Sequence, residues 1–186
     1  MQISHAIQQR RSVKRFTDQP VSREAIETLI ALATLAPNHR LTQPWRFYVL
    51  GAQARHAYGI ALGKRKAKKL ENLEAVRTMR DAVAEQHRAL PAMIVVAVVR
   101  NDNPEIQEED YGAAMMAVEN LALAALEQQL GTHIKTGGVM DDPEARAAVS
   151  VRDEERIVAV VHLGHPAELP PPRPRSPATT FTTWVE

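Results

Sequence analysis

The chain has 186 residues, of which 45% are hydrophobic and 24% are charged, enough to bury one core but too little for two comfortable domains. A net charge of +1 argues against a dedicated nucleic-acid binder, and the absence of cysteine excludes disulfides, thiolate metal ligands and thiol nucleophiles. The first residues lack the apolar core of a signal peptide, and no apolar run reaches the roughly 18 residues of a membrane span. We therefore expect one cytoplasmic domain over residues 1–186, without membrane attachment.

Elements of the first half follow from periodicity and capping signals. A short helix is expected over residues 3–9, and a second over 23–36, capped by Ser22 and closed by Pro37. Residues 45–50 predict a strand, and residues 52–62 predict a helix. Residues 64–88 are highly charged and predict a variable, solvent-exposed helical excursion.

The second half contains the best candidates for the core. Residues 92–99, "AMIVVAVV", lack polar alternation, which is typical of a central strand covered on both faces. Residues 111–130 predict a helix that is apolar on nearly every side, preceded by the acidic residues 108–110 and ended by Gly131 at C′. Such a helix has to be buried all round, which favours a homodimer interface over the alternative of a core helix in a monomer. A strand near 133–136, a helix over 143–149 and a strand over 156–164 complete the domain.

The C-terminal segment differs in composition. Six of the 12 prolines lie in residues 166–186, so this segment is expected to be extended. A disordered tail is the alternative. The closing "TTFTTWV" is rich in β-branched and aromatic residues, which suit an edge strand. We expect a rigid arm that ends in a docked strand.

Basic residues at the two ends of the chain are the main chemical signal. The sequence has no phosphate-binding loop, nucleophile elbow, zinc-type histidine pair or calcium loop, so hydrolase, kinase and metal chemistry have little support and no metal is expected. Arg10, Arg11 and Ser12 offer two guanidinium groups and a hydroxyl to a phosphate. A solvated charge run is the alternative. Arg173 and Arg175, separated by a proline, form a second pair, and the two clusters together would clamp one phosphate.

These motifs occur in an order that resembles a known family. "RRSVKRF", "APNHRLTQPWRFYVL", the long small-residue helix ending in "LG", "KTGG" and the closing "LGHP" and "RPRSP" together resemble the flavin-dependent nitroreductases, above all their short members. The resemblance covers nearly the whole chain and is weakest over residues 63–90. It implies an α+β nitroreductase-like fold, with a central, mostly antiparallel sheet flanked by helices. It also implies a homodimer with FMN at the interface and a C-terminal arm that embraces the partner.

The resemblance also implies which residues bind the cofactor. The phosphate, ribityl chain and pyrimidine would be contacted by Arg10, Arg11 and Ser12, and the tail pair near the phosphate would be Arg173 and Arg175. The flavin of the neighbouring subunit would be reached by His39 and Gln43. The isoalloxazine edge would be approached by the turn of Ile134, Lys135, Thr136 and Gly137. No side chain is expected to be catalytic, because FMN carries the hydride chemistry. Without the resemblance, His39 would be interpreted as a cap or surface residue.

The function implied by the resemblance is hydride transfer from NADH or NADPH through FMN to a small acceptor, such as a nitroaromatic or a quinone, in a ping-pong reaction. One alternative is a module that binds FMN or another phosphate ligand without redox turnover. Another is a family member with a different flavin reaction, such as dehalogenation, dehydrogenation or flavin destruction. The basic run over residues 64–69 is expected to be a solvated helix face, with admission of an anionic substrate or of a nicotinamide cofactor's phosphate as the alternative.

Overall fold

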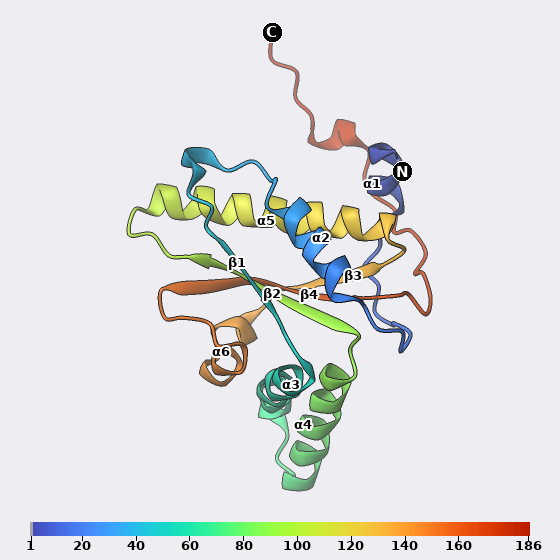
Figure 1. The fold of residues 1–186 in the computed structure, drawn as a ribbon, viewed down its shortest axis with the longest axis vertical. Helices are drawn as coiled ribbons and strands as arrows, with labels where there is room; N and C mark the ends of the chain where they lie inside the picture. The colour runs from blue at the N-terminus through green and yellow to red at the C-terminus, as the bar shows by residue number, and fades with distance from the viewer. Residues whose placement is uncertain (1) are drawn as a thin grey trace.

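A four-stranded sheet forms the centre of the computed structural model, which describes residues 2–186 (Figure 1). Its strands are β1 (Trp45–Val49), β2 (Ala92–Val99), β3 (Gly131–Lys135) and β4 (Glu155–Gly164). They lie in the order β1-β2-β4-β3, and every neighbouring pair is antiparallel. The predicted α+β fold with an antiparallel sheet is therefore confirmed.

Helices cover both faces of this sheet. The longest helix, α5 (Pro104–Glu127), and α2 (Arg23–Ala33) pack on one face, while α3 (Ala52–Lys66) and α6 (Pro143–Val149) pack on the other. Helix α4 (Leu73–Arg88) packs against α3, and the short α1 (Ile3–Gln9) begins the domain. Within residues 2–186 no helix is long and apolar enough to span a membrane.

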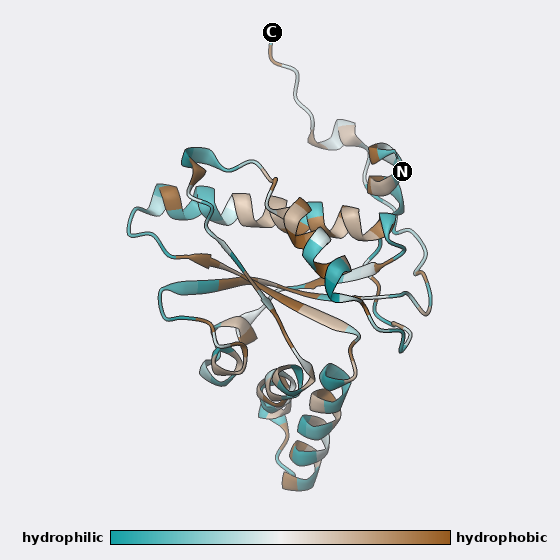
Figure 2. Ribbon diagram, in the orientation of Figure 1, coloured by the Kyte–Doolittle hydropathy of each residue, from teal (hydrophilic) through white to brown (hydrophobic). Residues whose placement is uncertain are grey.

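Strand β2 joins the two halves of the hydrophobic core. Ile94 and Val96 point toward α2 and α5, whereas Met93 and Val95 point toward α3 and α6, and all four are fully buried. The unbroken apolar run therefore reflects a strand covered on both faces, as predicted. Figure 2 shows the contrast between this apolar interior and the hydrophilic outer side of α4.

The charged excursion is more closely packed than the sequence predicted. Helix α3 continues to Lys66, a 3₁₀ turn follows at Ala67–Lys69, and α4 begins after Asn72, whose side chain caps it. Gly59 and Gly63 let the two helices approach closely, because a Cβ at Gly59 would lie 2.7 Å from the Cα of Ala84. Residues 73–88 therefore form a helix that packs one side against α3, while most of its residues stay exposed, as predicted.

This close approach makes Gly59 sensitive to substitution. A Gly59→Ala variant is expected to lose about 1–3 kcal/mol of unfolding free energy, since the new methyl group meets rigid backbone. Gly51→Ala is the matched control, because a Cβ added at Gly51 would meet no other atom within 4 Å. Urea denaturation followed by circular dichroism measures both variants, and equal stabilities would show that α4 can shift freely.

The end of α2 and the start of α5 also differ from their predicted positions. Helix α2 ends at Ala33 instead of residue 36, because a residue that precedes proline avoids the helical region and the chain already turns at Thr34. Helix α5 begins at Pro104 instead of residue 111, because Asn103 accepts a hydrogen bond from the Glu105 N–H at 2.9 Å and proline suits the first helical position.

The C-terminal end of α5 also corrects a prediction. The left-handed residue is Gln129, with φ of 57°, and not Gly131. Gly131 instead opens β3, where an added Cβ would lie 2.6 Å from Cγ2 of Val13. The glycine is therefore needed for the close approach of the N-terminal segment to this strand.

One side of α5 stays uncovered in the single chain. Helix α2 and the sheet pack against α5, but Tyr111 and Met116 remain 36% and 44% exposed. The predicted burial on every side is thus not achieved within one chain, which leaves an apolar face for a partner.

The two terminal segments meet beside β3. Ser12 forms a parallel bridge with Thr132, and the N–H of Ala167 donates to the carbonyl of Arg15 at 3.0 Å. Beyond this point the tail is extended, as predicted, but the predicted terminal strand does not form in the single chain. A 3₁₀ turn occupies Ala178–Phe181, and Trp184 is 89% exposed, so docking of this arm stays a prediction.

Candidate active site

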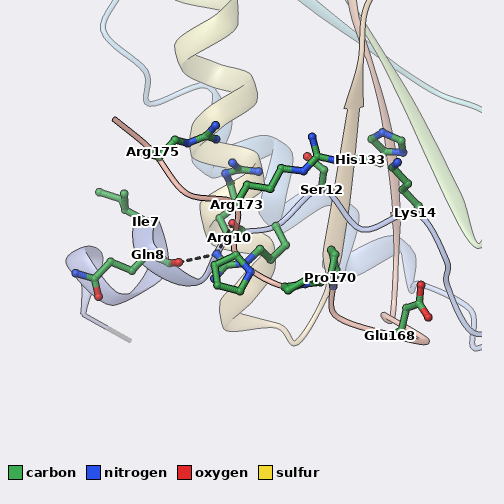
Figure 3. A pocket seen from close by; sticks show the side chains of 13 residues that line it. Ile7, Gln8, Arg10, Ser12, Lys14, His133, Glu168, Pro170, Arg173 and Arg175 are labelled. Carbon is green, nitrogen blue, oxygen red and sulfur yellow. Dashed lines mark hydrogen bonds between the residues drawn. The ribbon is translucent and has the colours of Figure 1, made fainter. Parts of the chain in front are cut away.

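A cavity of about 600 Å³ lies where the two terminal segments meet (Figure 3). The chain thereby brings together five of the residues predicted to bind phosphate, which come from opposite ends of the sequence. They are Arg10, Arg11, Ser12, Arg173 and Arg175. Lys14 adds a fifth basic side chain, against one lining carboxylate, Glu168. Such an excess of positive charge favours an anionic ligand.

Local structure fixes the N-terminal part of this cavity. The Arg10 N–H donates to the Ala6 carbonyl at 2.9 Å and so ends α1, while the Arg10 Nε lies 3.5 Å from Oε1 of Glu119 on α5. Nη1 of Arg11 donates to the carbonyl of Gln8 at 2.6 Å. Part of the Arg11 guanidinium is therefore committed to the helix end, whereas the bridge between Ser12 and β3 leaves the Ser12 side chain at the cavity wall.

Prolines hold the C-terminal part. Pro170, Pro171 and Pro172 line the same cavity, and Pro174 separates the two arginines. Because proline fixes φ, the tail loses little conformational entropy when Arg173 and Arg175 engage a ligand. Figure 3 shows Arg173 beside Arg10, although the two residues are far apart in the sequence.

A second cavity of about 380 Å³ lies at the end of β3. Three of the residues predicted at the flavin edge line it, namely Ile134, Lys135 and Thr136. Gly137 follows them with φ of 141°, a backbone conformation that glycine adopts without strain.

The basic run over residues 64–69 contributes to this second cavity. Lys66 lines it, whereas Lys64 pairs with Glu144 at 2.7 Å. Burial lowers the pKa of Lys135, and the charges of Lys66 and Lys14 lower it further. Lys66 is exposed, as predicted for a solvated face, but it also lines the second cavity together with Lys135.

Three histidines that the sequence analysis missed separate the cavities. His133 lines the first cavity, and His162 and His87 line the second. Their rings stack edge to face, with centroids 6.0 Å apart for His133 and His162 and 5.3 Å apart for His162 and His87. Burial lowers the pKa of His162 to about 2, so this ring is neutral. The three lie in three different elements, which no local pattern could connect.

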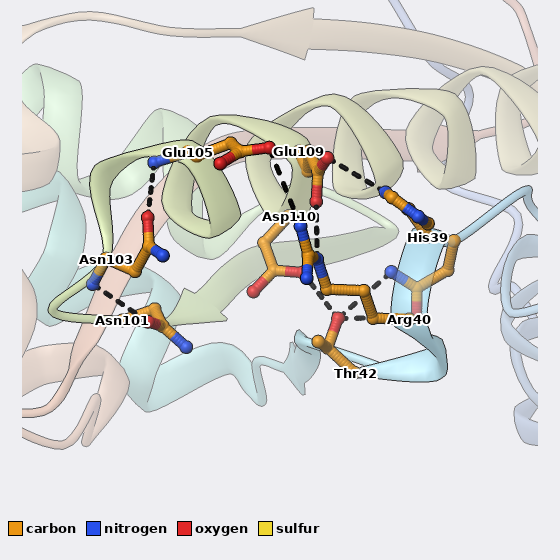
Figure 4. Close-up of polar contacts among 9 residues, drawn as sticks. His39, Arg40, Thr42, Asn101, Asn103, Glu105, Glu109 and Asp110 are labelled. Atoms are coloured by element: carbon orange, nitrogen blue, oxygen red, sulfur yellow. Dashed lines mark hydrogen bonds and ion pairs between the residues drawn. The ribbon is translucent and has the colours of Figure 1, made fainter.

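His39 and Gln43 lie elsewhere in the chain, on the loop beside the start of α5 (Figure 4). Nδ1 of His39 lies 2.8 Å from Oε1 of Glu109, whereas Arg10 pairs with Glu119 of the same helix. At a rise of about 1.5 Å per residue, these two points are roughly 15 Å apart along the axis. A single chain therefore does not bring His39 and Gln43 to the cavity.

The donor set suits a phosphate-bearing flavin. Guanidinium groups match phosphate oxygens, and the Ser12 hydroxyl is a neutral partner for a sugar-like chain. Lys66 and Lys135 in the second cavity suit the electron-rich edge of the ring. The part of the chain that the structure describes contains no group of three or more His, Asp or Glu side chains arranged for a metal ion.

Comparison with known proteins agrees with these features. The sequence model of the nitroreductase family matches residues 7–165. The chain is 29% identical over 174 residues to YfhC of Bacillus subtilis, provisionally named an NAD(P)H nitroreductase, with 92% of this chain and 88% of that protein covered.

Two solved structures have the same fold. A nitroreductase-like protein of Bacillus cereus superimposes with a TM-score of 0.87 at 27% identity, covering 100% of this chain and 97% of the other. A provisionally named nitroreductase of Desulfovibrio desulfuricans, solved in complex with FMN, gives a TM-score of 0.75 at 26% identity, with 99% and 96% covered.

Proposed function

Because the chain belongs to the nitroreductase family, we propose that it is an FMN-dependent oxidoreductase that takes hydride from NADH or NADPH. The acceptor is a nitroaromatic or a quinone, and the two half-reactions alternate in ping-pong fashion. The observation that carries this proposal is the cavity lined by Arg10, Ser12 and the tail arginines, which suits the FMN phosphate and ribityl chain. FMN bound in similar folds supports the choice of cofactor.

Each part of the site has a role in this proposal. Arg10, Arg173 and Arg175 hold the phosphate, and Ser12 contacts the ribityl chain. Lys135, which lines the second cavity, would lie at the pyrimidine edge, where a positive charge would stabilise the negative charge that the ring gains on reduction. FMN supplies the hydride chemistry when bound, so the protein's task is to bind, orient and charge-stabilise it.

A homodimer would complete the site. The uncovered face of α5 carries Tyr111 and Met116, and a two-fold axis through that face would pair the helix with its copy in opposite directions. The end of α5 that His39 contacts in one subunit would then lie near the end of α5 that Arg10 contacts in the other. The dimer would thereby bring together residues that lie roughly 15 Å apart along the helix in one chain. The exposed arm with Phe181 and Trp184 would gain a surface to cover.

An absorbance spectrum of the purified protein tests the proposal directly. Flavin bands are expected, and they should bleach when NADPH or NADH is added without oxygen and return when a nitroaromatic is added. Bands that respond to neither donor would favour the non-redox module or another flavin reaction. A protein that stays colourless and takes up no FMN would contradict the proposal.

A further inference from the structure

Three cations at the end of β3 lack counter-ions. Arg65 and Lys66 lie in the last turn of α3, and Lys135 is the last residue of β3. In the part of the chain that the structure describes, no hydrogen bond or ion pair joins any of these three side chains to another residue. The preceding residue, Lys64, differs because it pairs with Glu144 at 2.7 Å. The three cations therefore carry positive charge that the protein itself does not balance.

This charge lies beside the turn at Gly137, where the flavin edge is predicted. A Cβ added to Gly138 would lie 2.4 Å from Nη2 of Arg65, so the guanidinium rests against the backbone of that turn. Lys66 and Lys135 line the second cavity, and none of the described residues that line it is acidic. Burial lowers the pKa of Lys135 and the charge of Lys66 lowers it further, so these two cations lie close enough to repel each other. A bound anion would relieve this repulsion.

The FMN phosphate does not account for these cations. That phosphate is assigned to the first cavity, where Ser12 bridges to Thr132. Lys135 lies three residues further along β3, roughly 10 Å away at about 3.3 Å per residue. The negative charge that the ring gains on reduction can be balanced by Lys135. Arg65 and Lys66 are therefore left for another anionic group.

The hydride donor carries such groups. NADH and NADPH place the nicotinamide on the flavin ring for hydride transfer, and their phosphates extend away from it. Arg65 and Lys66 are exposed, so a ligand that reaches outward from the ring can meet them. A guanidinium matches two oxygens of one phosphate, and a lysine adds a point charge. Resting on the proposed function, we propose that Arg65 and Lys66 bind a phosphate group of the hydride donor and thereby favour NAD(P)H over a phosphate-free nicotinamide.

Anaerobic reduction of the bound flavin tests this proposal. Stopped-flow absorbance follows the bleaching of the flavin band in the holoenzyme with NADPH, with NADH or with 1-benzyl-1,4-dihydronicotinamide, which has the same reacting ring but no phosphate. Arg65→Ala is expected to lower the second-order rate constant with NADPH, NADH or both about 10-fold, the effect of losing one charged hydrogen bond. The rate constant with the benzyl donor should stay within about twofold of the wild type, because an uncharged donor does not sense the lost charge. Arg65→Lys keeps the charge and should recover part of the loss.

Lys69→Ala is the matched control. Lys69 belongs to the same basic run and is exposed, but it does not line the second cavity, so all three rate constants should stay unchanged. A loss in Arg65→Ala with NADPH alone would assign the cations to its 2′-phosphate, and a loss with both nucleotides would assign them to the diphosphate.

Three results would overturn the donor site. They are equal slowing with all three donors, no slowing with either nucleotide, and an equal loss in Lys69→Ala. A wild-type protein that holds no flavin, or whose flavin none of the donors reduces, would instead contradict the proposed function and this inference with it.

Discussion

Replacing Arg10 with alanine is expected to weaken FMN binding about 10- to 100-fold. A hydrogen bond between a guanidinium and a phosphate contributes roughly 1.5–3 kcal/mol, and about 1.4 kcal/mol corresponds to a tenfold change in Kd. Arg10 is suited to this role because its side chain is only 24% exposed and its Nε lies 3.5 Å from Glu119, so little ordering is needed on binding. Titration of the apoprotein with FMN, followed by flavin fluorescence, gives both dissociation constants.

Arg15→Ala is the matched control for this experiment. Arg15 belongs to the same basic cluster, but it is 75% exposed, pairs with Glu168 at 3.6 Å and does not line the cavity. It should therefore change FMN affinity by less than about threefold, because its charge is exposed and screened by salt and does not itself line the cavity. An equal loss of FMN affinity in both variants would mean that the cluster acts only through its net charge. An unchanged affinity in Arg10→Ala would contradict the assignment of the phosphate to this cavity.

Elements with strong local signals were predictable from the sequence. The bounds of β2 were predicted correctly because an unbroken apolar run admits few other structures, and those of α6 because Asp142 and Pro143 form a clear start signal. The start of α5 was missed although Asn103 and Pro104 form the same signal. The start was placed at residue 111 because the apolar residues begin there, whereas the first turns of this helix are mostly polar.

Other features depended on tertiary contacts. The exposure of most α4 residues was predicted from their charge. The packing of α4 against α3 was not, because it depends on Gly59 and Gly63 in another helix. At the site, the phosphate cluster was found because consecutive arginines are visible in a sequence. The neighbours that complete it, Lys14 and His133, were not, because their position depends on the pairing of residue 12 with β3.

The buried imidazoles have a measurable consequence for stability. His162 is 5% exposed, and its pKa is lowered to about 2 by burial and by the charge of Lys135, against about 6.5 in the unfolded chain. The unfolded state therefore binds a proton below pH 6.5 that the folded state does not bind. Stability is lost as pH falls from 6.5 toward 2, by about 1.4 kcal/mol per pH unit.

Between pH 6.5 and pH 4.5 this one histidine should remove about 2 kcal/mol of unfolding free energy. A His162→Leu variant lacks the titrating group and should show a correspondingly flatter pH dependence in urea denaturation. His5→Ala, which removes an exposed histidine, should follow the wild-type curve. His87 and His133, whose pKa values burial also lowers, remain in both proteins, so the difference between the curves reports the replacement of His162. Coincident curves for His162→Leu and the wild type would show that the folded protein accepts a proton at His162. Water would then reach the three stacked histidine rings.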